Sequence, residues 1–210
     1  YKHQAASELG KLGQESDKSR GFWVHSNLLL DARTQQTVGL IHQEWWMRPD
    51  NPEDADVKES GKWVDSSALC RLRLGKLISQ VINVCDREAD IFDYLMDKID
   101  HQERFIVRAK NMRKVEESGL PLDEHLRRLS PLGGYELYIP QKGMVDKRGK
   151  RKNRPARKAR LQIYSDKVTL NRGSQSLTLN VLLAEEVDPP QNAEPVSWSL
   201  LTSEPVTTLD

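Results

Sequence analysis

The chain has 210 residues, of which 37% are hydrophobic and 30% are charged. No run of about 18 apolar residues occurs and the first residues do not resemble a signal peptide, so the sequence predicts neither a membrane span nor secretion, and we expect a cytoplasmic protein. The net charge of +1 is unevenly distributed: residues 147–160 carry nine lysines and arginines and no acid, which leaves −8 for the remainder. So concentrated a positive charge predicts a polyanionic partner.

The first predicted elements are a β-hairpin and a helix. Apolar, β-favouring residues fill 22–32 and 37–46, and the polar segment between them is typical of a turn. Residues 48–60 are rich in proline and acids, which predicts a loop, and Ser60 is a candidate N-cap for the helix that follows. That helix is expected to end near Leu74, because a glycine comes next.

Further along, the alternation of strands and helices predicts a mixed α/β sheet. A strand is expected over 80–85, a helix over 88–98 and a strand over 104–110. Together with the hairpin, these elements make up a predicted core of residues 1–111.

Beyond residue 112 the sequence becomes mostly β. A short helix is expected over 121–129. The alternating segments after it predict five strands, at 135–140, 159–165, 167–172, 176–186 and 197–204. We therefore expect a β-rich insertion subdomain over 112–200, with residues 201–210 returning toward the core.

Asp86 lies where the strand over 80–85 ends. Ligands of open α/β sheets collect at the carboxyl ends of strands, and a hard cation such as Mg²⁺ is bound there by carboxylate oxygens. The competing interpretation is a helix cap, which is the commoner role of an aspartate at such a junction. Glu88 and Asp90 follow in the first helical turn, where the helix dipole favours acids, and we expect no further role for them.

The basic segment 147–160 has two interpretations. Gly149 and Pro155 interrupt it, so we expect no regular element there. One interpretation is a solvated, disordered loop, and the other is a flexible arm that binds phosphates. The two are compatible if the segment is disordered when free and becomes ordered on DNA.

Five tryptophans are a large number for a chain of this length. Trp23, Trp45, Trp46 and Trp63 fall on the faces of predicted elements, where we expect core or edge packing. Trp198 either packs in the same way or stacks on an unpaired base, and its position in the sequence leaves both open.

Few residues form a recognisable catalytic or ligand motif. The chain has no glycine-rich phosphate loop and no HExxH motif, its five histidines are scattered singly, and no Ser-His-Asp arrangement stands out. Cys70 and Cys85 lie 15 residues apart without a Cys/His ligand pattern. We expect both to be buried thiols in a reducing compartment and do not expect zinc.

Several segments together are similar to one protein family. They are "SRGFWVHSNLLLDA", "HQEWWMRP", "ESGKW", "CDREADI", "IPQKGMVDKRGKRKNRPARKA", "LLAEE" and "LLTSEP". This set resembles the IS4-type DDE cut-and-paste DNA transposases along the whole chain, with at most short gaps. The resemblance implies a ribonuclease H-like catalytic domain in which an Asp, an Asp and a Glu hold two divalent metal ions, Mg²⁺ or Mn²⁺, for phosphoryl transfer.

The resemblance also implies roles for particular residues. Asp86 matches the second Asp of the family and is expected to be catalytic and a metal ligand. Arg108 matches an arginine that contacts DNA, Lys110 lies in the same "VRAK" segment, and Trp198 matches a tryptophan that receives a flipped base. The other expected DNA contacts are Lys142, Lys147, Arg148, Lys150, Arg151, Lys152, Arg154, Arg157 and Lys158.

The chain departs from the family pattern at two places. No segment matches the "DTTS" that carries the first Asp, and no Tyr-x2-Arg-x3-Glu motif is present. We therefore expect a central fragment: an α/β, ribonuclease H-like mixed sheet without its first strand and last helix, whose two-metal site exists only in the complete protein. The expected partners are transposon-end duplex DNA, target DNA and a second copy in a homodimer. A truncated derivative that binds DNA without cutting it is the alternative.

Overall fold

The computed structural model describes residues 9–12, 19–50, 61–140, 142–145, 151–191 and 193–209, and for 142–145 and 151–154 it describes the backbone alone. The chain forms two compact units, Tyr1–Ile78 and Ser79–Asp210. Within the described ranges, no helix is long and apolar enough to cross a membrane.

The first unit contains the predicted hairpin. Strands β3 (Trp23–Leu30) and β4 (Thr37–Trp46) pair in antiparallel register, which confirms the prediction. The short strands β1 (Gly10–Lys11) and β2 (Arg20–Gly21) form a second antiparallel pair. Side chains along β3 alternate between half-buried and exposed, as expected of a hairpin that packs on one face only.

Helix α1 (Lys62–Leu74) packs on one face of this hairpin, where Ser66 Oγ donates a hydrogen bond to Asn27 Oδ1 at 2.6 Å. The helix ends as predicted, because Gly75 takes a positive φ of 51° that favours glycine. The expected N-cap, Ser60, lies outside the described residues.

The other face of the hairpin is exposed and apolar. Trp45 is 65% exposed and is opposite the exposed Val24 in the register of β3 and β4. Its only ring neighbour in the described part of the chain is Phe22, with ring centroids 6.3 Å apart. Of the two predicted alternatives for Trp45, core or edge packing, core packing is therefore wrong, because strand alternation turns the ring away from α1.

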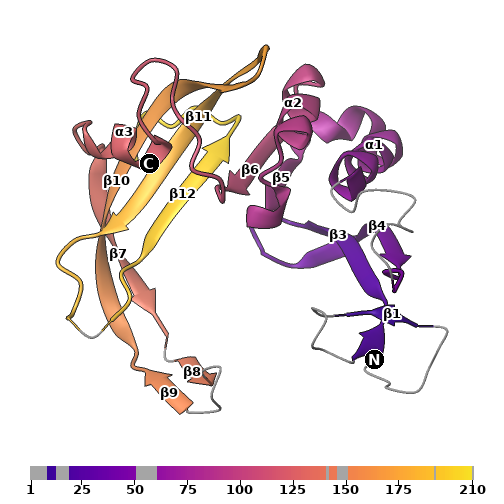
Figure 1. The fold of residues 1–210 in the computed structure, drawn as a ribbon, viewed down its shortest axis with the longest axis horizontal. Coiled ribbons are helices and arrows are strands. Elements are labelled where there is room, and N and C mark those ends of the chain that lie inside the picture. Colours follow the sequence, from indigo (N-terminus) through magenta and orange to yellow (C-terminus); the bar gives the residue numbers. More distant parts are fainter. Residues whose placement is uncertain are drawn as a thin grey trace. The chain divides into compact units, whose positions relative to one another are not determined.

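The second unit is built on a six-stranded sheet with the order β5-β6-β12-β11-β10-β7 (Figure 1). Its strands are β5 (Ile82–Cys85), β6 (Arg104–Arg108), β7 (Gly133–Ile139), β10 (Arg157–Arg172), β11 (Gln175–Glu186) and β12 (Ser197–Thr202). Strands β5 and β6 are parallel, and every other neighbouring pair is antiparallel. The predicted mixed α/β class is confirmed, and among the described strands β5 pairs with β6 alone.

Two helices belong to this unit. The predicted helix over 88–98 divides into a 3₁₀ turn, Arg87–Ala89, and helix α2, Phe92–Asp100. Helix α3, Leu122–Arg127, confirms the short helix predicted over 121–129.

Strand β10 runs unbroken through residues that were expected to separate two strands. The sequence predicts strands over 159–165 and 167–172 as alternating segments that are separated by a turn residue. Asp166, at that point, stays in register with β11. The buried side chains pass from odd positions such as Ile163 to even positions such as Val168, so one twisted strand contributes to a different core on each face of the sheet.

The basic segment also forms strands, contrary to the prediction that it has no regular element. Strand β8 (Lys142–Val145) pairs antiparallel with β9 (Arg151–Arg154), and β10 begins at Arg157. The ladder satisfies backbone polar groups whatever the charge of the side chains. In β10, moreover, Ala159 is buried while both its neighbours are exposed, so an alternation of small and charged residues is enough to anchor the strand.

One face of the sheet is covered by helices, and we call it the helix face. Figure 1 shows α2 beside β5 and β6, and α3 beside β10. The hydroxyl of Tyr94 on α2 lies 3.4 Å from the Sγ of Cys85 on β5. Phe105, Val107 and Leu201 on this face are fully buried. The helix face therefore carries the main core of the unit.

The opposite face of β5, β6 and β12, which we call the open face, is formed by the residues that alternate with the buried ones. They are Ile82, Val84, Arg104, Ile106, Arg108, Trp198 and Leu200. Val84 is 74% exposed and Trp198 is 39% exposed. Toward β7 the same face buries a smaller cluster of Ile139, Ala159, Leu161, Ile163, Ala184 and Val196.

Candidate nucleic-acid interface

Asp86 directly follows β5 and is exposed. Its backbone is extended, its Oδ1 accepts a hydrogen bond from the N–H of Glu88 at 3.0 Å, and its carbonyl oxygen accepts one from the N–H of Ala89. The cap interpretation is therefore confirmed. No hydrogen bond from the described residues reaches Oδ2 of Asp86, so the carboxylate retains acceptor capacity toward solvent.

Sheet register brings Asp86 and Arg108 to the same edge. The parallel strands β5 and β6 are aligned with Cys85 opposite Val107, so the next residues, Asp86 and Arg108, follow at adjacent carboxyl ends. Val107 points to the helix face, and alternation therefore directs Arg108 to the open face. Because the backbone of Asp86 stays extended, the same alternation applies to it.

Trp198 lies on the open face close to this edge. Leu200 of β12 is opposite Arg108 of β6, and Trp198 precedes Leu200 by two residues on the same side of the strand. Diagonal neighbours in an antiparallel pair are about 7–8 Å apart, within reach of long side chains. Asp86, Arg108 and Trp198 thus form one group on the sheet, although more than a hundred residues separate the first from the last.

Asp90 is predicted to be an acid of a first helical turn with no further role, and this prediction is wrong. Its side chain is 0% exposed, and it forms an ion pair with Arg113. Its Oδ2 accepts hydrogen bonds from the backbone N–H of Lys110 at 2.6 Å and of Asn111 at 2.8 Å. The sequence gives little signal for this role, because the partners lie beyond the next strand.

The expected DNA contacts of the basic segment are only partly described. Strands β8 and β9 continue the β7 and β10 pair as a narrow two-stranded ribbon (Figure 1). The backbone of this ribbon includes Lys142, Arg151, Lys152 and Arg154, whereas Lys147, Arg148 and Lys150 lie outside the described residues. The side chains of these four basic residues of the ribbon are not described, so the structure gives their backbone positions only.

Arg157 and Lys158 differ in their availability to a ligand. Arg157 donates to Glu186, with Nη2 2.8 Å from Oε2, and this hydrogen bond raises the pKa of the guanidinium above its usual range. Lys158 lies 3.2 Å from Glu136, with both side chains largely exposed. The Arg157 charge is therefore compensated within the fold, and Lys158 is the more accessible of the two.

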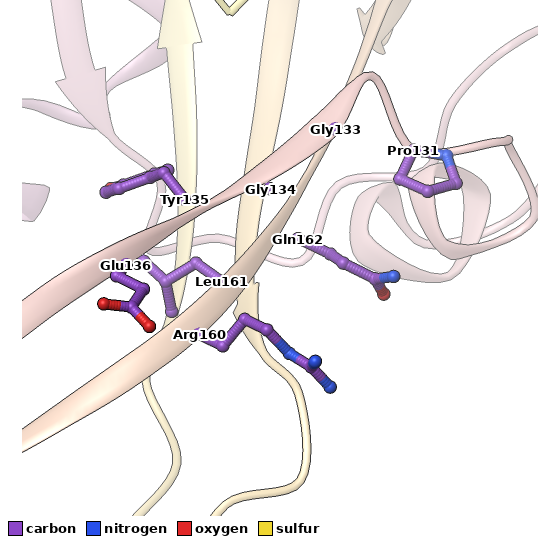
Figure 2. Close-up of a pocket in the computed structure, with 8 residues that line it drawn as sticks. All are labelled: Pro131, Gly133, Gly134, Tyr135, Glu136, Arg160, Leu161 and Gln162. Atoms are coloured by element: carbon purple, nitrogen blue, oxygen red, sulfur yellow. The ribbon is translucent and has the colours of Figure 1, made fainter.

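A surface pocket of about 570 Å³ lies between β7 and β10 (Figure 2). Tyr135 and Gln162 extend from it in opposite directions, as expected of residues on opposite faces of a strand pair. The lining side chains are therefore divided between the two faces of the strand pair, and we do not take the pocket as the candidate site.

The structure does assemble a Ser-His-Asp hydrogen-bond chain that sequence spacing did not reveal. The Nδ1 of His125 lies 2.9 Å from Ser118 Oγ, and its Nε2 lies 2.8 Å from Asp166 Oδ2. The same Ser118 Oγ accepts from the N–H of Leu120 at 3.3 Å. These contacts join the turn before α3 to β10, and we interpret them as fixing that turn.

Cys85, the residue before Asp86, has an unreactive thiol. Both cysteines are free thiols, and Cys70 is buried as predicted. Burial raises the pKa of Cys85, against a smaller opposite effect of its hydrogen bond with Tyr94. The thiol is therefore protonated at neutral pH and is a poor nucleophile or metal ligand.

The described residues do not fit the metal pair that the resemblance implies. No group of three or more His, Cys, Asp or Glu side chains in the described part of the chain is arranged to hold a metal ion. Asp86 is the carboxylate that the described residues place directly at the end of β5, and Mg²⁺ gives up its waters reluctantly to a single ligand. We therefore assign no catalytic step through a metal to these residues alone.

No model of a known protein family matches the chain. The structure shows a mixed α/β unit whose open sheet face carries Asp86, Arg108 and Trp198. The β7 and β10 pair of this unit continues into the cationic β8–β9 ribbon.

Proposed function

We propose that the chain is the central part of the catalytic core of a DDE-type cut-and-paste DNA transposase with a ribonuclease H-like fold, acting in the bacterial cytoplasm at the nucleoid. The reaction is metal-dependent phosphoryl transfer, in which transposon ends are nicked, converted to hairpins and joined to target DNA. The partners are transposon-end duplex DNA, target DNA and a second copy of the transposase.

The observation that carries this proposal is the grouping of Asp86, Arg108 and Trp198 on the open face. The resemblance assigns them a metal ligand, a DNA contact and a base-stacking residue, and these roles require them to be neighbours. The resemblance contains no information about sheet register, so the grouping is independent support.

Each residue of the group has a definite chemical task. Arg108 presents a guanidinium that pairs with a phosphate through two parallel hydrogen bonds. Trp198 offers a half-exposed ring on which an extruded base stacks. Asp86 supplies one carboxylate to the divalent ions, and ligands beyond the described residues complete the site.

The order of the strands supports the proposed insertion. Strands β6 and β12 are neighbours in the sheet although the whole β-rich segment from about residue 112 separates them in the sequence. The segment therefore begins after β6 and returns beside it as β12, as an insertion does, and its strands β11, β10 and β7 extend the same sheet beyond β12. Its cationic β8–β9 ribbon is the part proposed to follow the DNA backbone.

Salt-dependent DNA binding tests this function. We expect the chain to bind a labelled DNA duplex with a slope of about −5 in log K against log salt concentration, which corresponds to about six phosphate contacts. We also expect no nicking or joining of a supercoiled plasmid in Mg²⁺ or Mn²⁺, since two of the family's three carboxylates are not matched. A slope near zero contradicts the DNA-binding proposal, and clean metal-dependent cleavage contradicts the need for further carboxylates.

The alternative is a derivative that binds DNA and performs no chemistry. The presence of a single suitable carboxylate at the proposed site in the described residues favours it. The two candidates differ in the flanking coding sequence: an upstream "DTT" and a downstream Tyr-x2-Arg-x3-Glu support the transposase, and stop codons in their place support the binding module.

A further inference from the structure

We propose that Asp90 is a positioning residue that holds Asp86 and Arg108 in the arrangement that receives DNA, an inference that rests on the proposed function. Of the positions assigned to DNA or metal, Asp90 contacts Lys110, and it does so through the backbone N–H of that residue. Its side chain is completely buried, although it belongs to the exposed turn that follows Asp86. A buried carboxylate is retained only where donors surround it.

Asp90 binds the loop after β6 through both its side chain and its backbone. Oδ2 accepts the N–H groups of Lys110 and Asn111, and Oδ1 pairs with the guanidinium of Arg113. Its carbonyl oxygen accepts from Asn111 Nδ2 at 2.8 Å and Arg113 Nη2 at 3.2 Å. Five donors of one loop thus converge on a single residue, which fixes the course of that loop.

Within its own segment, Asp90 is linked to Asp86 by the short 3₁₀ turn Arg87–Ala89. The N–H of Ala89 donates to the carbonyl of Asp86 at 3.2 Å, and the N–H of Asp90 donates to the carbonyl of Arg87. The cap between Asp86 Oδ1 and the N–H of Glu88 closes the same turn. A displacement of Asp90 is therefore passed to the Asp86 carboxylate.

On the other side, the loop is tied to the strand that carries Trp198. Arg108 is the last residue of β6, and the next residue, Ala109, donates its N–H to Ser199 of β12 at 2.8 Å. Lys110 then donates to Asp90. The hydrogen bonds thus run without interruption from the Asp86 turn through Asp90 to the neighbours of Arg108 and Trp198.

The variant Asp90→Asn tests the positioning role with almost no change in side-chain size. Asparagine has nearly the same size, but its amide group presents N–H donors to a pocket that already contains the N–H groups of Lys110, Asn111 and Arg113. Facing donors repel, so the loop is expected to move away while β5 and β6 remain paired. The expected loss is of two phosphate contacts, those of Arg108 and Lys110.

The experiment measures binding of the full 210-residue chain to a labelled DNA duplex between about 50 and 200 mM salt. Asp90→Asn is expected to make the slope of log K against log salt less negative by about 1.8, at about 0.9 per phosphate contact. Arg113→Gln removes the ion pair and leaves both hydrogen bonds from backbone N–H groups to the Asp90 carboxylate. We therefore expect a change in slope about half as large. This second variant can be measured even if Asp90→Asn fails to fold.

Glu103→Gln is the matched control, because it alters another buried carboxylate of the same unit away from this loop. It is expected to reduce the folded fraction and leave the slope unchanged, as a purely structural effect does. Arg108→Ala tests the underlying function and is expected to shift the slope by about 0.9. If Arg108→Ala shifts the slope but neither Asp90→Asn nor Arg113→Gln does, the positioning role is wrong; if Arg108→Ala leaves it unchanged, the proposed DNA-binding face is wrong.

Discussion

Replacing Glu103 by alanine is expected to lower the free energy of unfolding of the second unit by about 3–5 kcal/mol. Glu103 Oε2 lies 2.6 Å from Lys98 Nζ, and the two side chains are 1% and 0% exposed. Removal of the carboxylate deprives an ammonium group in the core of this ion pair, and the loss of a counter-charge is costly there. The ring of Tyr94, 5.2 Å from the ammonium, supplies only a weak cation–π contact.

Native-state hydrogen exchange of the amides of α2 and β6 measures this effect for the second unit alone. The double variant Lys98→Met with Glu103→Leu is expected to recover most of the loss, because an apolar pair of similar volume needs no charge compensation. Asp188→Asn, which breaks the exposed pair with Arg160, is the matched control and is expected to cost less than about 1 kcal/mol. An equally small cost for Glu103→Ala refutes the stabilising role of the buried pair.

Asp86→Asn is expected to reduce DNA cleavage by about a thousandfold or more in a complete transposase that contains this sequence, since several kcal/mol of charge stabilisation depend on the carboxylate. The substitution is informative because asparagine retains an Oδ1 acceptor. The cap to the N–H of Glu88 is preserved, and stability is expected to be nearly unchanged. The lost property is therefore the negative charge and not the fold.

Glu88→Gln is the control for Asp86→Asn, because Glu88 is an exposed acid two residues away, on the 3₁₀ turn. It is expected to leave the cleavage rate within about threefold, as surface substitutions usually perturb energies only slightly. Duplex binding by both variants is expected to match the unmodified protein in the absence of metal. If cleavage survives Asp86→Asn but falls with Glu88→Gln, the assignment of the catalytic carboxylate to Asp86 is wrong.

Much of the fold follows from local pattern. Apolar, β-favouring segments predict β3 and β4, and period-2 alternation predicts β11. Gly75, which takes a positive φ, ends α1 where the sequence predicts the end of that helix. These features depend on neighbours in the chain. The cap at Asp86 is predictable for the same reason, because its partner is two residues away.

The misjudged features all depend on contacts between distant residues. Asp166 is typical of a turn between two strands, and only the pairing with β11 shows that one strand continues through it and contributes to two cores. The basic segment was judged from its charge, whereas the ribbon of β8 and β9 is held by its backbone. The role of Asp90 is not predictable from its place near a helix start, because its partner Arg113 lies beyond the next strand.

The candidate site illustrates the same limit. Resemblance indicated Asp86, Arg108 and Trp198 one at a time, and sequence alone gave no reason to place them on one face. The register of β5 with β6 and of β6 with β12 supplies that reason. The side chains of the β8–β9 ribbon are not described, so their DNA contacts stay predictions.

The stacking of an unpaired base on Trp198 tests the open face most directly. The measurement is the fluorescence of a 2-aminopurine placed unpaired at the end of a DNA duplex and titrated with the chain. We predict strong quenching, abolished by Trp198→Ala with a loss of about 1–3 kcal/mol in binding, and unaffected by Trp45→Ala, which alters an exposed tryptophan of the other unit. Quenching that persists in Trp198→Ala, or disappears in Trp45→Ala, contradicts the account.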